Sequence, residues 1–273
     1  MSNNQRYKHP IVTSSHQQGA VLIVVLLFLV LIILAGAIAV KQSTTDLKLS
    51  TSDQINTLLL QSADDANQNI EQSMNGSSDA DAYDAMIARG GPFGHFILTD
   101  YSVENEYVFC FRPRDQLFNI NKTTILTPDG TITNKGYCNP STPDDYVSSR
   151  NTSMTQVNVS LTPPSAENEA FGSYTIGQGS DSLASKAFMF DINSTAVLPS
   201  YGDTKVGSDN CFEQTSRLYT TDNADKTIGG CMAKVGVPST VIYEMAEVEN
   251  QSLRTACVEF GKGAGLLCTL PAS

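Results

Sequence analysis

Hydrophobic and polar positions divide the chain into a polar leader, an apolar run and a mixed body. Residues Ala20–Val40 (AVLIVVLLFLVLIILAGAIAV) carry no charged and no strongly polar side chain. At 1.5 Å of rise per residue, a helix over this run is roughly 31 Å long, close to the thickness of a bilayer core. The pattern therefore predicts a membrane-spanning helix.

The helical pattern continues beyond Val40. No glycine or proline follows until Gly76, and apolar or small residues recur every three or four positions, which is one face of a helix. These residues are Leu47, Thr51, Ile55, Leu58, Leu59, Ala63, Ala66, Ile70 and Met74. We expect one helix from about residue 20 to about residue 74, apolar all round in 20–40 and amphipathic in 41–75.

Residues 76–273 have the pattern of a globular domain made mostly of strands. A short helix is predicted after Ser78 or Asp79, with a glycine-rich exit at Gly90, Gly91 and Gly94. Alternation and a high content of β-branched and aromatic residues predict four strands. They are Glu106–Arg112, Thr155–Leu161, Lys186–Ile192 and Thr240–Glu247.

Long loops rich in Ser, Thr, Asn, Asp and Gly separate these strands, at 127–153, 162–182 and 199–230. Loops of this length are usually functional or tied by cross-links. A helix followed by antiparallel strands predicts the α+β class, with the amphipathic half of the helix packed on one face of the sheet.

Charge sets the expected orientation in the membrane. The leader, residues 1–19, contains Arg6 and Lys8 and no acid, whereas the whole chain has a formal net charge of −11. The positive-inside rule places such a leader in the cytoplasm and the body across the membrane, although Lys41 is a contrary charge. An acidic body also lacks the clustered Lys and Arg that nucleic acid requires.

All six cysteines lie after the apolar run, in the region expected to be oxidising. They form no C-x-x-C pair, which argues against a zinc site or a thioredoxin-type motif. Six cysteines allow fifteen pairings. We favour nearest neighbours in sequence, namely Cys110–Cys138, Cys211–Cys231 and Cys257–Cys268, with reduced core thiols as the alternative.

Chemistry-bearing motifs are scarce. His95 is the only histidine after the leader, in GGPFGHF at an expected entry from loop to strand, and we interpret it as structural. The sequence has no G-x-S-x-G, H-E-x-x-H, Walker A or G-x-G-x-x-G motif. The carboxylate pairs are expected to be solvated; they are Asp64/Asp65, Asp79/Asp81 and Asp144/Asp145. Calcium at Asp79–Asp81 or Asp222–Asp225 is a weaker alternative, since neither has EF-hand spacing.

The stretch HQQGAVLIVVLLFLVLIILAGAIAVKQSTTDLKLS resembles the N-terminus of type IV pilus assembly proteins of the PilX family. In that pattern a glycine preceded by Gln or Arg ends the leader and a Leu/Val-rich helix starts at once, as with Gly19 and Ala20 here. The resemblance covers roughly the first 60 residues. A weaker one covers KAFMFDINSTA (Lys186–Ala196) and PSTVIYEMAEV (Pro238–Val248).

One position departs from the common pilin pattern. Most type IV pilins have Phe at the first mature position and Glu at the fifth, where this chain has Ala20 and Val24. That Glu normally pairs with the N-terminal amine of a neighbouring subunit, because a carboxylate in an apolar filament core needs a partner. A subunit with Val24 cannot make this pair, which looks like the minor pilins of the PilX type and the GspK-like tip pseudopilin of type II secretion.

The resemblance implies a pilin-like fold with long disulfide-pinned loops, and a specific life history. A prepilin peptidase would cleave between Gly19 and Ala20 and methylate the amine of Ala20. The protein would stay in the bacterial inner membrane, with its N-terminus cytoplasmic and its body periplasmic, until it entered a pilus on the cell surface.

The resemblance also implies a function. As a minor pilin the protein would prime pilus assembly and contact other minor pilins and the major pilin through its N-terminal helix. At the tip it would meet a PilY-type adhesin and support adhesion, twitching motility or DNA uptake. No catalysis, cofactor, metal or direct binding of nucleic acid is implied.

Three alternatives share the same apolar run. Ala37-Ile-Ala39 fits an A-x-A site, so signal peptidase would cut after Ala39 and release a soluble secreted or periplasmic protein. An uncleaved single-span protein with a sensing domain would retain Met1. A tip pseudopilin of type II secretion would be processed like a pilin but would serve a different machine.

Overall fold

The computed structural model describes residues 18–75, 81–98, 102–113, 120–128, 130–131, 135–162, 187–217, 221–249, 257–258 and 264–266. The chain divides into two compact units, Met1–Gln54 and Ile55–Ser273. In its described part the first unit is helical throughout. The second unit is an α+β body, as predicted for the class of the fold.

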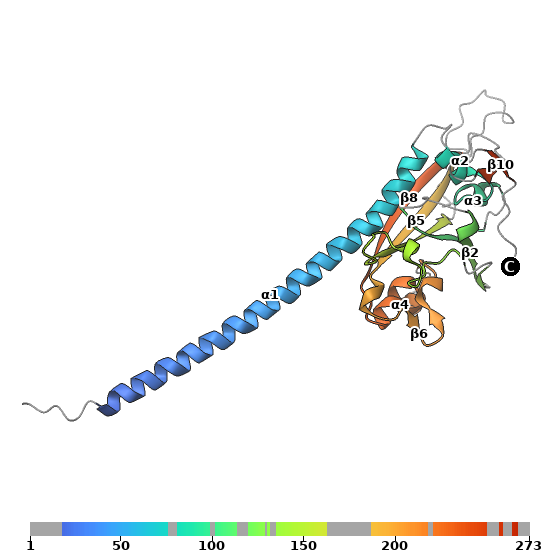
Figure 1. Ribbon diagram of the computed structural model, residues 1–273. Helices are drawn as coiled ribbons and strands as arrows, with labels where there is room; N and C mark the ends of the chain where they lie inside the picture. The colour runs from blue at the N-terminus through green and yellow to red at the C-terminus, as the bar shows by residue number, and fades with distance from the viewer. Residues whose placement is uncertain are drawn as a thin grey trace, which may run out of the picture. The chain divides into compact units, whose positions relative to one another are not determined.

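Helix α1 spans Gln18–Met74, which confirms the single long helix expected from the sequence (Figure 1). The threonines near its middle do not interrupt it. The hydroxyls of Thr44 and Thr45 both donate to the carbonyl of Lys41, and the hydroxyl of Thr51 donates to the carbonyl of Leu47. Each of these hydrogen bonds is to a carbonyl one turn earlier in the same helix. The hydroxyl groups are therefore hydrogen-bonded without interrupting the backbone hydrogen bonds of the helix.

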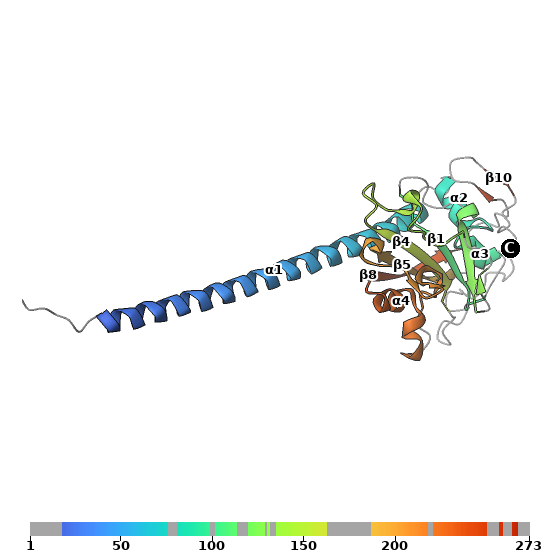
Figure 2. The ribbon, with the colours of Figure 1, turned by 60° about the horizontal axis from the view of Figure 1, so that its bottom comes forward.

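The body is built on a six-stranded antiparallel sheet in the order β3-β2-β1-β4-β5-β8 (Figure 2). Its strands are β1 (Glu106–Cys110), β2 (Thr123–Thr127), β3 (Gly130–Thr131), β4 (Met154–Leu161), β5 (Ala187–Val197) and β8 (Ser239–Glu249). The four predicted strands are confirmed as β1, β4, β5 and β8. Strands β2 and β3 were not predicted.

Smaller elements surround the sheet. The helices are α2 (Asp81–Ile87), α3 (Gly94–Leu98) and α4 (Ile228–Lys234), and the short strands are β6 (Lys205–Val206), β7 (Asp209–Asn210), β9 (Cys257–Val258) and β10 (Ala264–Leu266). Short 3-10 helices lie at Ile120–Lys122, Pro143–Asp145, Pro199–Tyr201, Cys211–Glu213 and Thr221–Lys226. The expected N-cap at Ser78 or Asp79 and most of the loop 162–182 lie outside the described residues.

Two local predictions were wrong. His95 lies in α3 rather than at the start of a strand. The chain turns back so tightly there that a Cβ on Gly94 would lie 2.0 Å from the carbonyl oxygen of Ala88, so only glycine fits at this position. The segment 199–230 is also more than a loop, since α4 begins at Ile228 after Thr227, whose hydroxyl accepts from the N–H of Gly230 as an N-cap.

The sheet is covered on both faces over β1 and β4. Successive side chains of β1 point to opposite faces of the sheet. Tyr107 and Phe109 pack in a core with residues of α1, α2 and α3, and Val108 and Cys110 pack in a second core on the opposite face. The second core contains both described disulfides and residues of α4. The prediction of a helix on one face is therefore incomplete, because the segment around α4 covers the other.

The last five turns of α1 belong to the body. Leu59, Ala63, Ala66 and Ile70 of the predicted stripe are buried. Leu47, in the first unit, is exposed, so burial along the stripe does not extend over the whole of 41–75. Within the body the small side chains of Ala63 and Ala66, both 0 % exposed, give the helix close access to the sheet.

Two polar residues also lie on this buried face of α1, and the apolar pattern gave no sign of them. Ser62 shares hydrogen bonds with Ser153 and Thr155. The side-chain oxygen of Asn67 accepts a hydrogen bond from the hydroxyl of Ser194 on β5. These bonds fix the position of the helix along the sheet, since apolar contacts alone are not directional.

We expect Asn67→Ala to lower the free energy of unfolding of the body by about 2 kcal/mol, because it leaves the buried hydroxyl of Ser194 without its acceptor. Asn69→Ala is the matched control, because the Asn69 side chain bonds only to the carbonyl of Asp65 on the exposed side of the same helix. Thermal unfolding of the full-length chain in detergent, followed by near-ultraviolet circular dichroism, measures both. Equal losses would show that Asn67 has no specific role.

Candidate functional site

The apolar part of α1 exposes nearly all of its hydrophobic surface. Every large apolar side chain from Val21 to Val40 is at least 50 % exposed. By its length and composition, this is one helix in the described chain that is able to cross a membrane. At about 25 cal/mol per Å² of apolar surface, leaving these side chains in water is costly, so they require lipid or other apolar helices around them.

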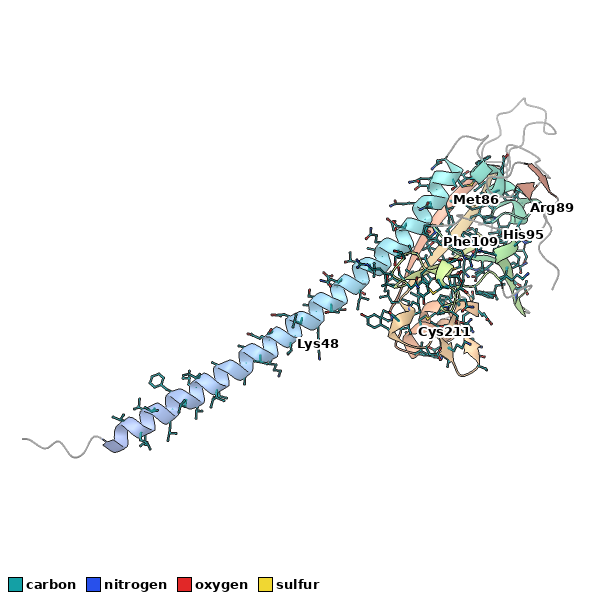
Figure 3. All side chains as sticks on the ribbon, viewed as in Figure 1. Lys48, Met86, Arg89, His95, Phe109 and Cys211 are labelled. Carbon is teal, nitrogen blue, oxygen red and sulfur yellow. A yellow bond between two sulfur atoms is a disulfide. The ribbon has the colours of Figure 1, made fainter. Side chains whose placement is uncertain are left out.

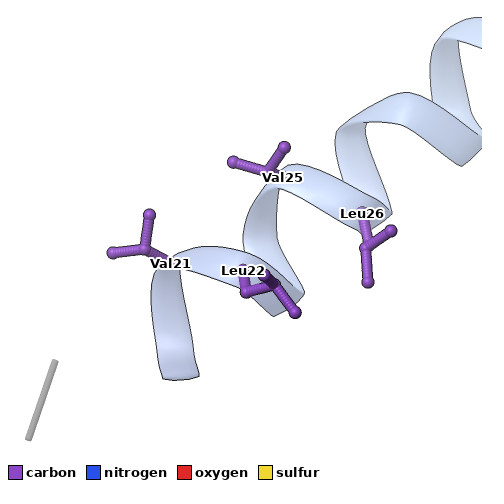
Figure 4. A pocket seen from close by; sticks show the side chains of 4 residues that line it. All are labelled: Val21, Leu22, Val25 and Leu26. Carbon is purple, nitrogen blue, oxygen red and sulfur yellow. The ribbon is translucent and has the colours of Figure 1, made fainter. Parts of the chain in front are cut away.

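The first turns of this segment contain no reactive group. Val21, Leu22, Val25 and Leu26 line a shallow hollow of about 340 Å³ (Figure 4). All four side chains come from one helix and all are apolar. This surface is apolar and offers no acid, base or nucleophile.

The predicted processing site lies in the first turn of α1, which begins at Gln18. The side chains of Gln18 and Ala20 lie outside the described residues, so cleavage after Gly19 and methylation of Ala20 stay predictions. Val24, at the fifth position of the expected mature chain, is 50 % exposed. Its surface belongs to the continuous apolar one described above.

Two of the three predicted disulfides are present. Cys110 is bonded to Cys138, and Cys211 is bonded to Cys231. The first ties the end of β1 to the segment after β3, and the second ties a 3-10 turn to α4. Each disulfide closes a loop, which lowers the conformational entropy of the unfolded chain and so stabilises the fold. The pair Cys257–Cys268 stays a prediction, because Cys268 lies outside the described residues.

The carboxylate pair Asp144/Asp145 is not solvated as predicted. Asp144 is exposed, but Asp145 is only 2 % exposed. The Nε and a terminal nitrogen of Arg112 each lie 2.7 Å from Oδ1 of Asp145, and the N–H of Asn139 donates to Oδ2 at 2.9 Å. This ion pair joins the same two segments as the Cys110–Cys138 disulfide. Its contacts hold these two segments together.

A second buried carboxylate, Glu106, organises the segment 215–217. It is 1 % exposed and accepts hydrogen bonds from the side chain of Asn158, from the hydroxyl of Thr215, and from the N–H and hydroxyl of Ser216. The Nε of Arg217 lies 3.5 Å from Oε1. Its acceptor capacity is used by these donors, so Glu106 anchors a loop to the sheet. Sequence reasoning counted this glutamate only as the first residue of a strand.

In the part of the chain that the structure describes, the candidate groups for catalysis or metal binding do not converge. His95 is buried, and its ring packs against Phe96 and Tyr107, with centroid separations of 5.3 and 6.0 Å (Figure 3). Asp225 of the second calcium candidate forms an ion pair with Lys234 at 2.9 Å, and Asp79 lies outside the described residues. Within the described chain, no group of three His, Cys, Asp or Glu residues is placed to hold a metal.

Carboxylates gather between α1 and β8. Desolvation raises the pKa of Glu244 above its ordinary value, and the charges of Glu71 and Asp64 raise it further. A carboxyl group with a raised pKa in the folded state binds a proton more readily than the unfolded chain does. It therefore destabilises the fold at neutral pH, and this cost disappears as the pH falls through the folded pKa.

We expect Glu244→Gln to raise the stability of the body at pH 7, by a fraction of a kcal/mol for a group this exposed. The gain should shrink as the pH is lowered, because Glu244 itself is then protonated. Thermal unfolding between pH 7 and pH 4 measures the difference. Glu213→Gln, at an acid in the turn Cys211–Glu213 away from α1, is the control. A gain in stability that does not change with pH would contradict a raised pKa of Glu244.

Comparisons with protein-family models, with curated proteins and with solved structures give no match for this chain. Its function is therefore argued from its own features: an exposed apolar helix, and a body tied by disulfides and buried polar clusters.

Proposed function

We propose that this chain is a minor pilin of a type IV pilus, of the PilX kind, and that it acts by assembly rather than by catalysis. One observation carries the proposal. Helix α1 runs without interruption from an exposed apolar segment into a stripe that forms part of the core of an α+β body. A subunit so built can be held in a membrane, extracted, and packed into a filament by the same apolar surface.

The uninterrupted helix also bears on the alternative of a secreted protein. Release after Ala39 would leave a mature chain starting inside α1, at Val40, with exposed residues such as Leu47 and Leu49 ahead of the body. In a soluble protein these leucines would be left exposed to water at the N-terminus, without packing on the body. An anchored subunit uses the same residues as a spacer between membrane and body.

In this proposal the body stands outside the inner membrane and the N-terminus lies in the cytoplasm, where a prepilin peptidase cleaves after Gly19. Val24 removes the carboxylate that would pair with the next subunit, which suits a position at the end of the filament. Partners are other minor pilins, the major pilin and a PilY-type adhesin. A tip pseudopilin of type II secretion would share all of these features except the machine it serves.

Mass spectrometry of the mature N-terminus tests the proposal. A chain that begins at Ala20 with one methyl group on its amine is the expected result. A chain that begins at Val40 would identify a secreted protein, and a chain that retains Met1 would identify an uncleaved membrane protein. Loss of pili on deletion, with secretion intact, separates the pilus from type II secretion.

A further inference from the structure

Strand β8 lies at one end of the sheet. It pairs with β5 along its whole length of 11 residues, and no strand in the described chain pairs with its other edge. In Figures 1 and 2 it lies beside β5 at the border of the body. Natural proteins usually protect an open edge with charged side chains, proline or a bulge. The sequence of β8, STVIYEMAEVE, has neither proline nor lysine, its register with β5 is regular, and its only charges are glutamates, which a basic partner would neutralise.

The outer face of β8 exposes three neighbouring large apolar side chains. Val241, Tyr243 and Met245 are 44 %, 56 % and 57 % exposed, whereas Ile242 and Ala246, on the opposite face, pack on the cores beneath α1. The hydroxyl of Tyr243 donates to Asp191 on β5 at 2.5 Å and so holds the exposed ring in place. An ordered aromatic ring beside aliphatic side chains is a typical anchor of a protein interface.

Acidic groups also lie along this edge. Strand β8 contains three glutamates and no base, and alternation places Glu244 on the inner side with Ile242 and Ala246 and Glu247 on the outer side with Met245. Glu244 lies close enough to Asp64 and Glu71 of α1 to feel both charges, and both residues belong to the body. Among the described residues, no Lys or Arg forms an ion pair with Glu244, Asp64 or Glu71; the ion pairs of the body involve Asp145, Glu106 and Asp225 instead.

We propose that the open edge of β8 is a docking site for an extended strand of a different protein chain, apolar on one face and basic on the other. Main-chain hydrogen bonds along the edge would supply affinity, as in other cases of strand addition. The apolar side chains of the incoming strand would cover Val241, Tyr243 and Met245. Its Lys or Arg side chains would neutralise Glu244, Asp64 and Glu71.

A second copy of this chain is a poor occupant of the same edge. Its own β8 would bring three further glutamates and no base, and like charges across paired strands are unfavourable. The edge, its apolar face and its acids all belong to the body, so the proposal does not depend on membrane anchoring or on the role of the protein in a pilus.

The test uses the full-length chain in detergent micelles and two synthetic probes. One is a ten-residue peptide of alternating Val and Lys, and the other has Glu in place of Lys. The Val/Lys peptide is expected to bind and to slow hydrogen exchange of the amides of β8, while the Val/Glu peptide does neither. Glu244→Lys should weaken binding of the Val/Lys peptide about tenfold. Asp203→Lys, at an exposed acid of the body, makes the same change in charge and should leave binding unaltered.

Several results would overturn the proposal. They are equal binding of both peptides, binding that leaves the amides of β8 unprotected, and equal effects of Glu244→Lys and Asp203→Lys. Protection of β8 that rises with protein concentration and no peptide would instead identify a second copy, and protection that rises with added micelles would identify lipid. If Glu244→Lys fails to fold by circular dichroism, Glu71→Lys on the exposed side of α1 replaces it.

Discussion

Gly19→Leu is expected to abolish processing, so that the protein accumulates with its leader Met1–Gly19 attached. The expected reason is steric. In the proposed processing the cut bond follows a glycine, which lets another chain approach the backbone closely, and a leucine side chain would block that approach. The intact mass of protein made in cells that contain such a peptidase measures the outcome directly, and the amine of Ala20 should then carry no methyl group.

Gly36→Leu is the matched control for this prediction. Gly36 is a glycine of the same helix, and a Cβ placed on it would meet nothing within 4 Å. The change adds the same side chain to the same apolar segment, so it tests effects on membrane insertion without touching the cut bond. It should be processed normally. A Gly19→Leu protein of mature size, starting at Ala20, would disprove the pilin assignment.

The signals of the proposed processing site are local, but cleavage there stays a prediction. Polar leader, Gly19 and apolar run follow one another along the chain. Helix α1, by contrast, is confirmed, since periodicity over so many turns outweighs any local ambiguity. Strands β4, β5 and β8 were found for the same reason, as each alternates over seven or more residues.

Some short elements were missed because they carry too little pattern. Strand β2 has five residues, and its pairing partner is β1, with Ile125 opposite Tyr107. Helix α3 has five residues and α4 has seven, which is two turns or less. Such elements are held by tertiary contacts and caps rather than by propensity, as the hydrogen bond of Thr227 and the Cys211–Cys231 disulfide show for α4.

The buried polar clusters were inaccessible for a different reason. Asp144 and Asp145 are identical in type and adjacent in sequence, and both lie in a loop rich in polar residues. They differ in their contact with Arg112, which forms an ion pair with Asp145. Arg112 lies near Cys110, and the Cys110–Cys138 disulfide brings it close to Asp145 although the two residues are distant in sequence. Burial at a single position is decided by such distant partners, and no local pattern encodes them.

That distinction predicts a large difference between two neighbouring substitutions. Asp145→Ala is expected to lower the free energy of unfolding by about 3 kcal/mol, because it leaves the guanidinium of Arg112 buried without its counter-charge. The Arg112 side chain is only 9 % exposed, so water cannot replace the lost carboxylate. The N–H of Asn139 loses its acceptor as well. Thermal and denaturant unfolding of the full-length chain in detergent, with the disulfides intact, measure the loss.

Asp144→Ala removes the same charge from the next position, where the side chain is exposed, and should change stability by less than about 0.5 kcal/mol. Equal losses from the two variants would mean that net charge, not the buried pair, sets the stability. The double variant Arg112→Met, Asp145→Leu distinguishes the contribution of the ion pair from that of side-chain packing at the same place. Replacing both charges by apolar side chains should restore much of the stability lost in Asp145→Ala, because the cost lies in the unpaired charge rather than in the missing attraction.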